Sequence, residues 1–266
     1  MPELPEVERF RKLAEREALH QEINYLDILD ERLLDTPRDE LEAALVGKTF
    51  TATGRLGKYL LLVADAKNAL NIHFGMSGSL VAVAAYEHWP KFSYVRFGLA
   101  PGNGLAFCCP RKLGRVRMVR DLENLRAQKS LGPDALALSL DDFLDILKDR
   151  KAPIKSIIMN QSLMAGIGNW IADDALFRAG VHPATPCWYL NQSRQEAVFR
   201  GIQDVLRMAI ECNADYRCFP NEMIFHQRSK KGISPATGNP IAKIQVGGRS
   251  TYFCPDTQPA SETLKT

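Results

Sequence analysis

The stretch AGIGNWIADDALFRAG, residues 165–180, joins a glycine-rich turn to a helix with a start and a stop signal. Asn169 follows the glycines as a candidate N-cap, and Gly180 stands where the helix would end. Backbone amides and the helix dipole at such an N-terminus favour an anion. A capping role alone would also explain Asn169, so this pattern by itself does not decide whether an anion binds there.

Three more helices are predicted around this stretch from caps and apolar spacing. Their ranges are 140–149, after the capping pair Ser139 and Asp142; 153–165; and 193–213, after a capping box of Ser193 and Glu196.

The flanking regions follow a different pattern. Residues 47–119 read as short strands separated by turn signals such as PGNG at 101–104, which predicts an all-β sandwich. A helix over residues 5–19 precedes it, and a two-stranded ribbon is predicted around Gly247 and Gly248. The fold class is therefore α+β.

The domain boundaries follow from these changes of pattern. We expect a sandwich domain over residues 1–126, a helical domain over 127–222, a β-hairpin over 223–258 and a disordered tail over 259–266.

Charge and composition narrow the class of protein. The net charge is only +3, but residues 88–120 carry seven cations and residues 223–255 carry five, with no acid in either window. Two basic windows favour a polyanion-binding surface over solvated strand faces. The N-terminus lacks a secretory signal, no apolar run could span a bilayer, and six scattered cysteines form no disulfide framework. We expect an intracellular protein, in the cytoplasm and nucleoid or in a nucleus.

The first eight residues, MPELPEVE, offer a nucleophile. Removal of Met1 would leave Pro2 with a terminal secondary amine, and terminal amines have an ordinary pKa of about 7.7–8.0. A neutral amine can attack an aldehyde-level carbon and form a Schiff base, with Glu3 as proton donor or acceptor. On these residues alone, a plain lead into a helix explains Pro2 and Pro5 as well.

Seven motifs follow one another along residues 1–258: MPELPEVE (1–8), GRLGKYLLL (54–62), IHFGMSGSL (72–80), PRKLGRVRM (110–118), LGPDAL (131–136), APIKSIIMNQSLMAGIGNWIADDALFRAGVHP (152–183) and GGRSTYFCPDTQ (247–258). In this order they resemble the formamidopyrimidine-DNA glycosylase and endonuclease VIII family, closest to its plant and fungal branch.

The resemblance implies a bifunctional base-excision enzyme, a DNA glycosylase and abasic-site lyase, that flips a damaged nucleotide out of the duplex. It makes Pro2 the nucleophile and Glu3 the proton shuttle. It further assigns Lys58 to a phosphate contact and β-elimination, and Arg249 to the lesion phosphates and δ-elimination. The 165–180 stretch then belongs to a helix–two-turn–helix motif that binds DNA.

The resemblance also implies further DNA contacts. Met76, Arg111 and Leu113 correspond to residues that fill the space left by the flipped base, with Leu113 at a position where the family often has Phe. The contacts to the DNA backbone would come from His73, Arg150, Lys155 and Asn169. A satisfied structural histidine is nearly as good an interpretation of His73.

The ribbon departs from the family's four-cysteine finger. The ligand positions correspond to Ser234, Thr237, Cys254 and Thr257, so three of four thiolates are absent and we expect neither zinc nor any other cofactor. In the family a loop that covers 8-oxoguanine lies between the last helix and the ribbon, and residues 213–228 leave little room for it here. The resemblance therefore implies weak 8-oxoguanine excision, with formamidopyrimidines, hydantoins and oxidised pyrimidines preferred.

The expected partner is double-stranded DNA with a damaged base or abasic site, bound by a monomer. A catalytically silent DNA-binding scaffold on the same fold is the alternative, and only the resemblance disfavours an RNA-processing role.

Overall fold

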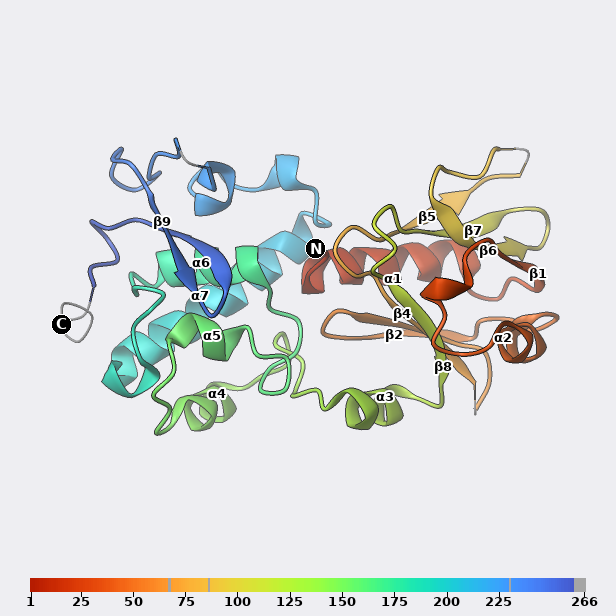
Figure 1. The fold of residues 1–266 in the computed structure, drawn as a ribbon, viewed down its shortest axis with the longest axis horizontal. Helices are drawn as coiled ribbons and strands as arrows, with labels where there is room; N and C mark the ends of the chain where they lie inside the picture. The colour runs from red at the N-terminus through yellow and green to blue at the C-terminus, as the bar shows by residue number, and fades with distance from the viewer. Residues whose placement is uncertain (67, 86, 230, 261–266) are drawn as a thin grey trace. The chain divides into compact units, whose positions relative to one another are not determined.

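A computed structural model describes the chain except for residues 67, 86, 230 and 261–266 (Figure 1). The chain forms two compact units, Met1–Ser130 and Leu131–Thr266. The division falls after residue 130 rather than after 126, because helix α3 (Leu122–Lys129) packs against strands of the first unit. The ribbon, predicted as a separate domain, falls within the second unit. Most of the predicted tail, 261–266, lies outside the described residues.

The first unit contains two four-stranded antiparallel sheets, as the predicted sandwich requires. One sheet has the order β1 (Ile23–Ile28), β6 (Ser93–Leu99), β7 (Gly104–Cys108), β5 (Ser79–Val83). The other has the order β2 (Ala52–Leu56), β3 (Tyr59–Val63), β4 (Ala69–His73), β8 (Arg115–Val119).

Helix α1 (Leu4–Ala18) packs against both sheets and completes their shared core (Figure 1). Its apolar spacing places Val7, Phe10 and Ala14 on one buried face. The rings of Phe10 and Phe74 lie 4.5 Å apart between centroids, which anchors the helix next to the end of β4. The leading helix of the prediction is therefore part of the core.

Several elements of the first unit were not predicted. They are β1, η1 (Glu31–Leu33), α2 (Arg38–Leu45) and α3. Strand β1 alternates poorly between apolar and polar residues, and α2 buries only Leu41 and Leu45. Short elements of this kind form because neighbouring parts of the fold cover them, so local pattern gives a weak signal.

The second unit is helical and ends in the ribbon. Its elements are α4 (Leu140–Leu147), α5 (Ile154–Ile158), α6 (Asn169–Arg178), η2 (Cys187–Tyr189), α7 (Gln192–Glu211), η3 (Tyr216–Cys218), η4 (Ile224–Gln227), β9 (Ala242–Val246) and β10 (Arg249–Phe253). The predicted Ser139 cap of α4 is confirmed, since its hydroxyl accepts from the Asp142 amide at 3.1 Å.

One helix prediction in this unit is wrong in its extent, and another is wrong only in its cap. The helix expected over 153–165 ends at Ile158, because the following backbone pairs with another segment: the Gly132 amide donates to the Gln161 carbonyl at 2.9 Å. The long helix α7 begins one residue before Ser193, and its cap is Asn191, whose side chain accepts from the Arg194 amide at 3.0 Å.

The ribbon forms as predicted. Strands β9 and β10 pair antiparallel, with Val246 opposite Arg249, so Gly247 and Gly248 make a two-residue turn. Their φ values of +55° and +73° are those that such a turn requires and that glycine adopts without strain.

Candidate functional site

The N-terminus of α1 holds the proline and glutamate that the sequence singles out. Glu3 is the N-cap of α1 and is only 3% exposed. It forms a capping box with Glu6, in which the Glu3 amide donates to the Glu6 carboxylate at 2.9 Å and the Glu3 side chain accepts from the Glu6 amide. The positive end of the helix dipole favours a carboxylate there. Half-buried Pro2 therefore precedes a carboxylate whose position is fixed.

The turn between β2 and β3 carries Lys58, which is 7% exposed. This turn is tied to α1 by an ion pair between Arg55 and Glu8, with Nε and Oε2 2.9 Å apart. Arg55 also donates through Nη1 to the Gly57 carbonyl at 3.2 Å. The ion pair thus fixes the Lys58 turn relative to the helix that starts beside Glu3.

His73, the last residue of β4, lies in a positively charged setting. Burial lowers the pKa of His73 to about 4, and the charges of Lys58 and Arg117 add to the effect. The ring is therefore neutral at pH 7. Its Nδ1 accepts from the Gly75 amide at 3.3 Å, which leaves Nε2 as the protonated nitrogen. In the protein without DNA, His73 therefore presents a neutral ring with one N–H donor.

Two loops of the first unit carry the predicted space-filling residues. Met76 lies between β4 and β5, and Arg111 and Leu113 lie between β7 and β8; Met76 is 44% and Leu113 47% exposed. A Cβ added to Gly75 would lie 2.5 Å from the Leu113 carbonyl carbon, so the two loop backbones touch. The exposed apolar tips therefore sit on adjoining loops. Their insertion into DNA stays a prediction.

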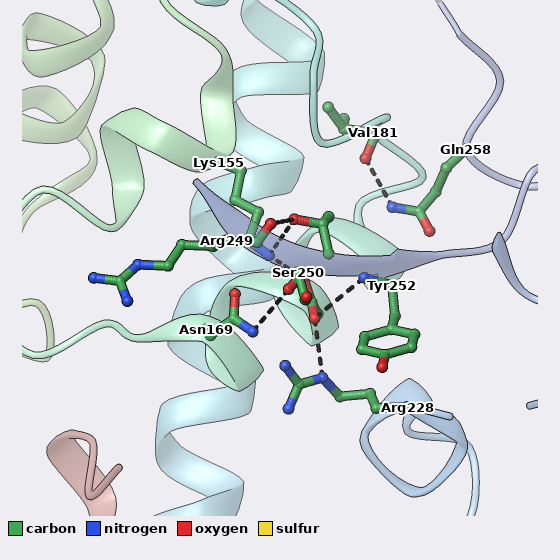
Figure 2. Close-up of polar contacts among 10 residues, drawn as sticks. Lys155, Asn169, Val181, Arg228, Arg249, Ser250, Tyr252 and Gln258 are labelled. Carbon is green, nitrogen blue, oxygen red and sulfur yellow. Dashed lines mark hydrogen bonds and ion pairs between the residues drawn. The ribbon is translucent and has the colours of Figure 1, made fainter. Parts of the chain in front are cut away.

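The glycine-rich turn before α6 differs from the prediction in its cap. The N-cap is Gly168, and Asn169 is the first residue of the helix. The Asn169 side chain instead donates through Nδ2 to the Ser250 carbonyl of β10 at 2.9 Å (Figure 2). The predicted capping role is therefore wrong, because this side chain fastens the ribbon to α6.

Lys155 was predicted to reach DNA as a cation at a helix start, and the structure contradicts this. Its side chain has no exposed surface, and its Nζ lies 2.6 Å from Asp173 Oδ1 and 2.8 Å from Thr251 Oγ1. An ammonium enclosed in this way cannot meet a phosphate unless the fold opens.

The other predicted cations of the second unit lie at the surface. Arg249, directly after the ribbon turn, is exposed, and its side chain extends away from the buried polar contacts (Figure 2). Arg150 is half-buried and donates through Nε to the Ile146 carbonyl. Both remain candidates for contact with an anion.

Hydrogen bonds hold the end of the ribbon where a finger would have its metal. Asp256 accepts from Thr237 at 3.1 Å and from Asn239 at 3.0 Å, and the Cys254 amide donates to Gln258 at 2.9 Å. Burial raises the pKa of the Cys254 thiol, but hydrogen bonds from Ser234 and Thr257 outweigh it and bring the value to about 7. Across the described residues, no three His, Cys, Asp or Glu side chains gather in a way that could hold a metal ion.

Sequence reasoning missed the partners that anchor the ribbon. The anchoring acid is Asp173, which is 1% exposed and receives Arg228 Nε at 3.0 Å; its neighbour Asp174 is fully buried. Two adjacent acids within the largely apolar run WIADDALF were the available signal. An aromatic cluster of Trp170, Tyr216, Phe219 and Phe225 was missed as well, with ring centroids 4.9–6.5 Å apart.

Comparison with known proteins agrees with this architecture. Residues 1–116 match the model of the formamidopyrimidine-DNA glycosylase N-terminal domain, and residues 131–219 match that of its H2TH domain. Fold and matches together define a DNA glycosylase of base excision repair with two units. No helix in the described part of the chain is long and apolar enough to cross a membrane.

Curated relatives and solved structures identify the family. A formamidopyrimidine-DNA glycosylase of Arabidopsis thaliana is 35% identical, covering 97% of this chain and 71% of the relative. One of Geobacter metallireducens is 33% identical over 97% of this chain and all of its own. The Lactococcus lactis enzyme, solved non-covalently bound to DNA containing an AP site, has a TM-score of 0.88 at 28% identity and covers 97% of this chain and 100% of its own. The chain belongs to the formamidopyrimidine-DNA glycosylase family.

Proposed function

We propose that this protein is a bifunctional DNA glycosylase and abasic-site lyase that removes oxidised bases through its N-terminal proline. The Pro2 nitrogen attacks C1′ of the flipped nucleotide, and the C1′–base bond breaks as the base leaves with a proton. The nitrogen lone pair then opens the C1′–O4′ bond, O4′ takes up a proton, and the iminium so formed acidifies the C2′ proton. Loss of that proton expels the 3′ phosphate by β-elimination, and a second elimination expels the 5′ phosphate.

One observation carries this proposal: Glu3, the residue next to Pro2, is only 3% exposed and takes part in a capping box. A carboxylate held by the Glu6 amide and the dipole of α1 is positioned to accept and return protons at the reacting sugar. The Arg55–Glu8 ion pair supports the role of Lys58 in the phosphate contact and β-elimination, since it ties the Lys58 turn to that helix.

The test is borohydride trapping on a duplex with a single abasic site. We expect a covalent adduct with the wild type, and with Glu3→Gln a slower yield. Pro2→Ala leaves a primary amine, so the sharper variant is one that retains Met1, whose Pro2 nitrogen is an amide. Mass spectrometry establishes the state of the N-terminus in each sample. No wild-type adduct, or an equal adduct with Met1 retained, would refute the mechanism.

The segment of residues 213–228, which follows α7, supports a lesion preference. Its residues pack on α6 through rings, with Trp170 5.5 Å from Phe219 and 5.4 Å from Phe225 between centroids. A segment packed in this way leaves little chain to cover an 8-oxoguanine base. We therefore propose formamidopyrimidines, hydantoins and oxidised pyrimidines as preferred substrates and 8-oxoguanine as a poor one, with double-stranded DNA inside the cell as the partner. A panel of matched lesion duplexes tests this, and fastest excision of 8-oxoguanine would overturn it.

We also propose that the enzyme works as a monomer without zinc. The hydrogen bonds around Asp256 and Cys254 close the ribbon with groups that need no metal. Stoichiometric zinc in protein purified without chelator would contradict this proposal.

A further inference from the structure

Three buried polar side chains connect α5, α6 and β10. Lys155, Asp173 and Thr251 are each at most 1% exposed. The Lys155 ammonium lies 2.6 Å from Asp173 Oδ1 and 2.8 Å from Thr251 Oγ1. Removing an ion pair from water carries a desolvation penalty that apolar residues would avoid. Its presence here calls for a role beyond filling space.

The hydrogen bonds of this trio have a fixed direction. An ammonium group only donates, so Thr251 Oγ1 must accept from Lys155. The hydroxyl proton is then directed to the Arg249 carbonyl, 3.0 Å away. A continuous chain therefore runs from the Asp173 carboxylate through the ammonium and the hydroxyl to the backbone of Arg249.

The second carboxylate oxygen of Asp173 also contacts β10, at Tyr252. It accepts from Arg228 Nε at 3.0 Å and from the Tyr252 amide at 3.4 Å. The Asn169 side chain secures the Ser250 carbonyl at 2.9 Å. The residues that follow Arg249 are thus fastened one after another to the two helices.

The turn of the ribbon rests on the same support. A Cβ at Gly247 would lie 2.7 Å from Ser156 Oγ of α5, so the turn approaches this helix as closely as a glycine allows. Arg249 lies between this contact and the Thr251 hydroxyl. Both ends of the short segment that carries it are fixed, while its guanidinium remains exposed.

We propose that Asp173, Lys155 and Thr251 are positioning residues that orient Arg249 for the second elimination, acting where a metal-bound finger would rely on zinc. This inference rests on the proposed function, and on the family resemblance for the assignment of Arg249 to the lesion phosphates and δ-elimination. A directional chain of charged and hydroxyl groups fixes the backbone of one residue, which apolar packing of equal volume would not do.

The test is a matched pair at one position. Thr251→Val keeps the shape but removes the hydroxyl that joins Lys155 to the Arg249 carbonyl; Thr251→Ser keeps the hydroxyl. On an abasic-site duplex we expect Thr251→Val to trap with borohydride within about twofold of wild type, with at least a tenfold fall in the ratio of δ- to β-elimination product. Thr251→Ser should stay within twofold of wild type in both measurements.

A structural effect is separated from a positioning effect by Val198→Ala, a buried change on α7 away from the ribbon. All variants are assayed well below their unfolding temperatures. This control should leave the product ratio unchanged, since a destabilised enzyme that is still folded makes both products in the same proportion. An unchanged ratio in Thr251→Val, or an equal fall in Thr251→Ser, overturns the inference.

The result also distinguishes this inference from the proposed function. A wild-type protein that traps no DNA defeats the proposed mechanism itself. A wild type that traps DNA and yields both products, with Thr251→Val unaffected, leaves that mechanism standing and removes only the positioning role. A wild type that traps DNA without δ product refutes the role of Arg249 and this inference with it.

Discussion

Replacing Asp173 with asparagine would remove the carboxylate that pairs with Lys155 at 2.6 Å in the interior of the second unit. Breaking a buried ion pair from one side costs about 3–5 kcal/mol, because the remaining charge stays buried. Arg228 would also lose its partner at 3.0 Å, although it is partly exposed and can be hydrated. We therefore expect the free energy of unfolding to fall by about 3–5 kcal/mol, or roughly 10–20 °C in Tm.

The reverse substitution should cost less. Lys155→Met leaves Asp173 with Arg228 and the Tyr252 amide, so its carboxylate retains a cation and a donor. We expect a loss of about 1–3 kcal/mol, which is the cost of the hydrogen bonds removed. The difference in free energy of unfolding between the two variants follows from the contacts of Asp173, which keeps other partners when Lys155 is removed.

Urea denaturation and calorimetry at pH 7 measure both variants. Asp204→Asn serves as the control, because this acid is exposed on α7 of the same unit and should change stability by less than about 0.5 kcal/mol. A loss below about 1 kcal/mol for Asp173→Asn, or equal losses for Asp173→Asn and Lys155→Met, would show that Lys155 does not depend on this carboxylate.

Two further predictions concern other parts of the chain. Gly75→Ala adds a Cβ 2.5 Å from the Leu113 backbone at a φ of +59°, so it should lower the free energy of unfolding by about 2–5 kcal/mol. It should also slow excision from duplex DNA more than cleavage of a preformed abasic site. The control is Gly102→Ala, which is strained in φ but lies 3.6 Å from its nearest neighbour. Equal slowing of both reactions would contradict the proposed link between these loops and base flipping. Burial raises the pKa of Asp174 to about 8, with the Asp173 carboxylate adding to it. Between about pH 4 and 8 the folded state therefore keeps a proton on Asp174 that the unfolded state has already lost. The free energy of unfolding falls as the pH rises through this window, by at most about 1.4 kcal/mol per pH unit. Asp174→Asn should flatten this dependence in urea denaturation at pH 5.5, 6.5 and 7.5, and parallel curves for the two proteins would refute it.

The elements that the sequence predicted well are those with strong local signals. The ribbon turn is one, since Gly247 and Gly248 both need a positive φ. The Ser139 cap and the apolar face of α1 are others. Where the prediction failed, distant partners decided the structure: the backbone after Ile158 leaves the helix to pair with residues near Gly132.

The candidate site shows the same division. The order of motifs was enough to select Pro2, Glu3 and Lys58 as candidates. It could not show that Lys155 is buried, because a lysine at a helix start is usually solvated. Asp173 and Thr251, which stabilise the buried ammonium, lie far along the chain. It also could not show that Asn169 holds the ribbon, since the Ser250 carbonyl is 81 residues away in sequence.

The closure of the ribbon has a chemical consequence for the conditions in which such an enzyme works. A finger built on four thiolates releases its metal when peroxide oxidises them, and oxidised DNA arises under the same conditions. Here a carboxylate, an amide and a hydroxyl join the strand ends through Asp256, Asn239 and Thr237, and peroxide leaves these groups unchanged. The one sulfur in residues 223–258 that a peroxide could attack as a thiol is that of Cys254, which has no exposed surface. A ribbon assembled from such groups can keep its shape during the oxidative stress that creates its substrates.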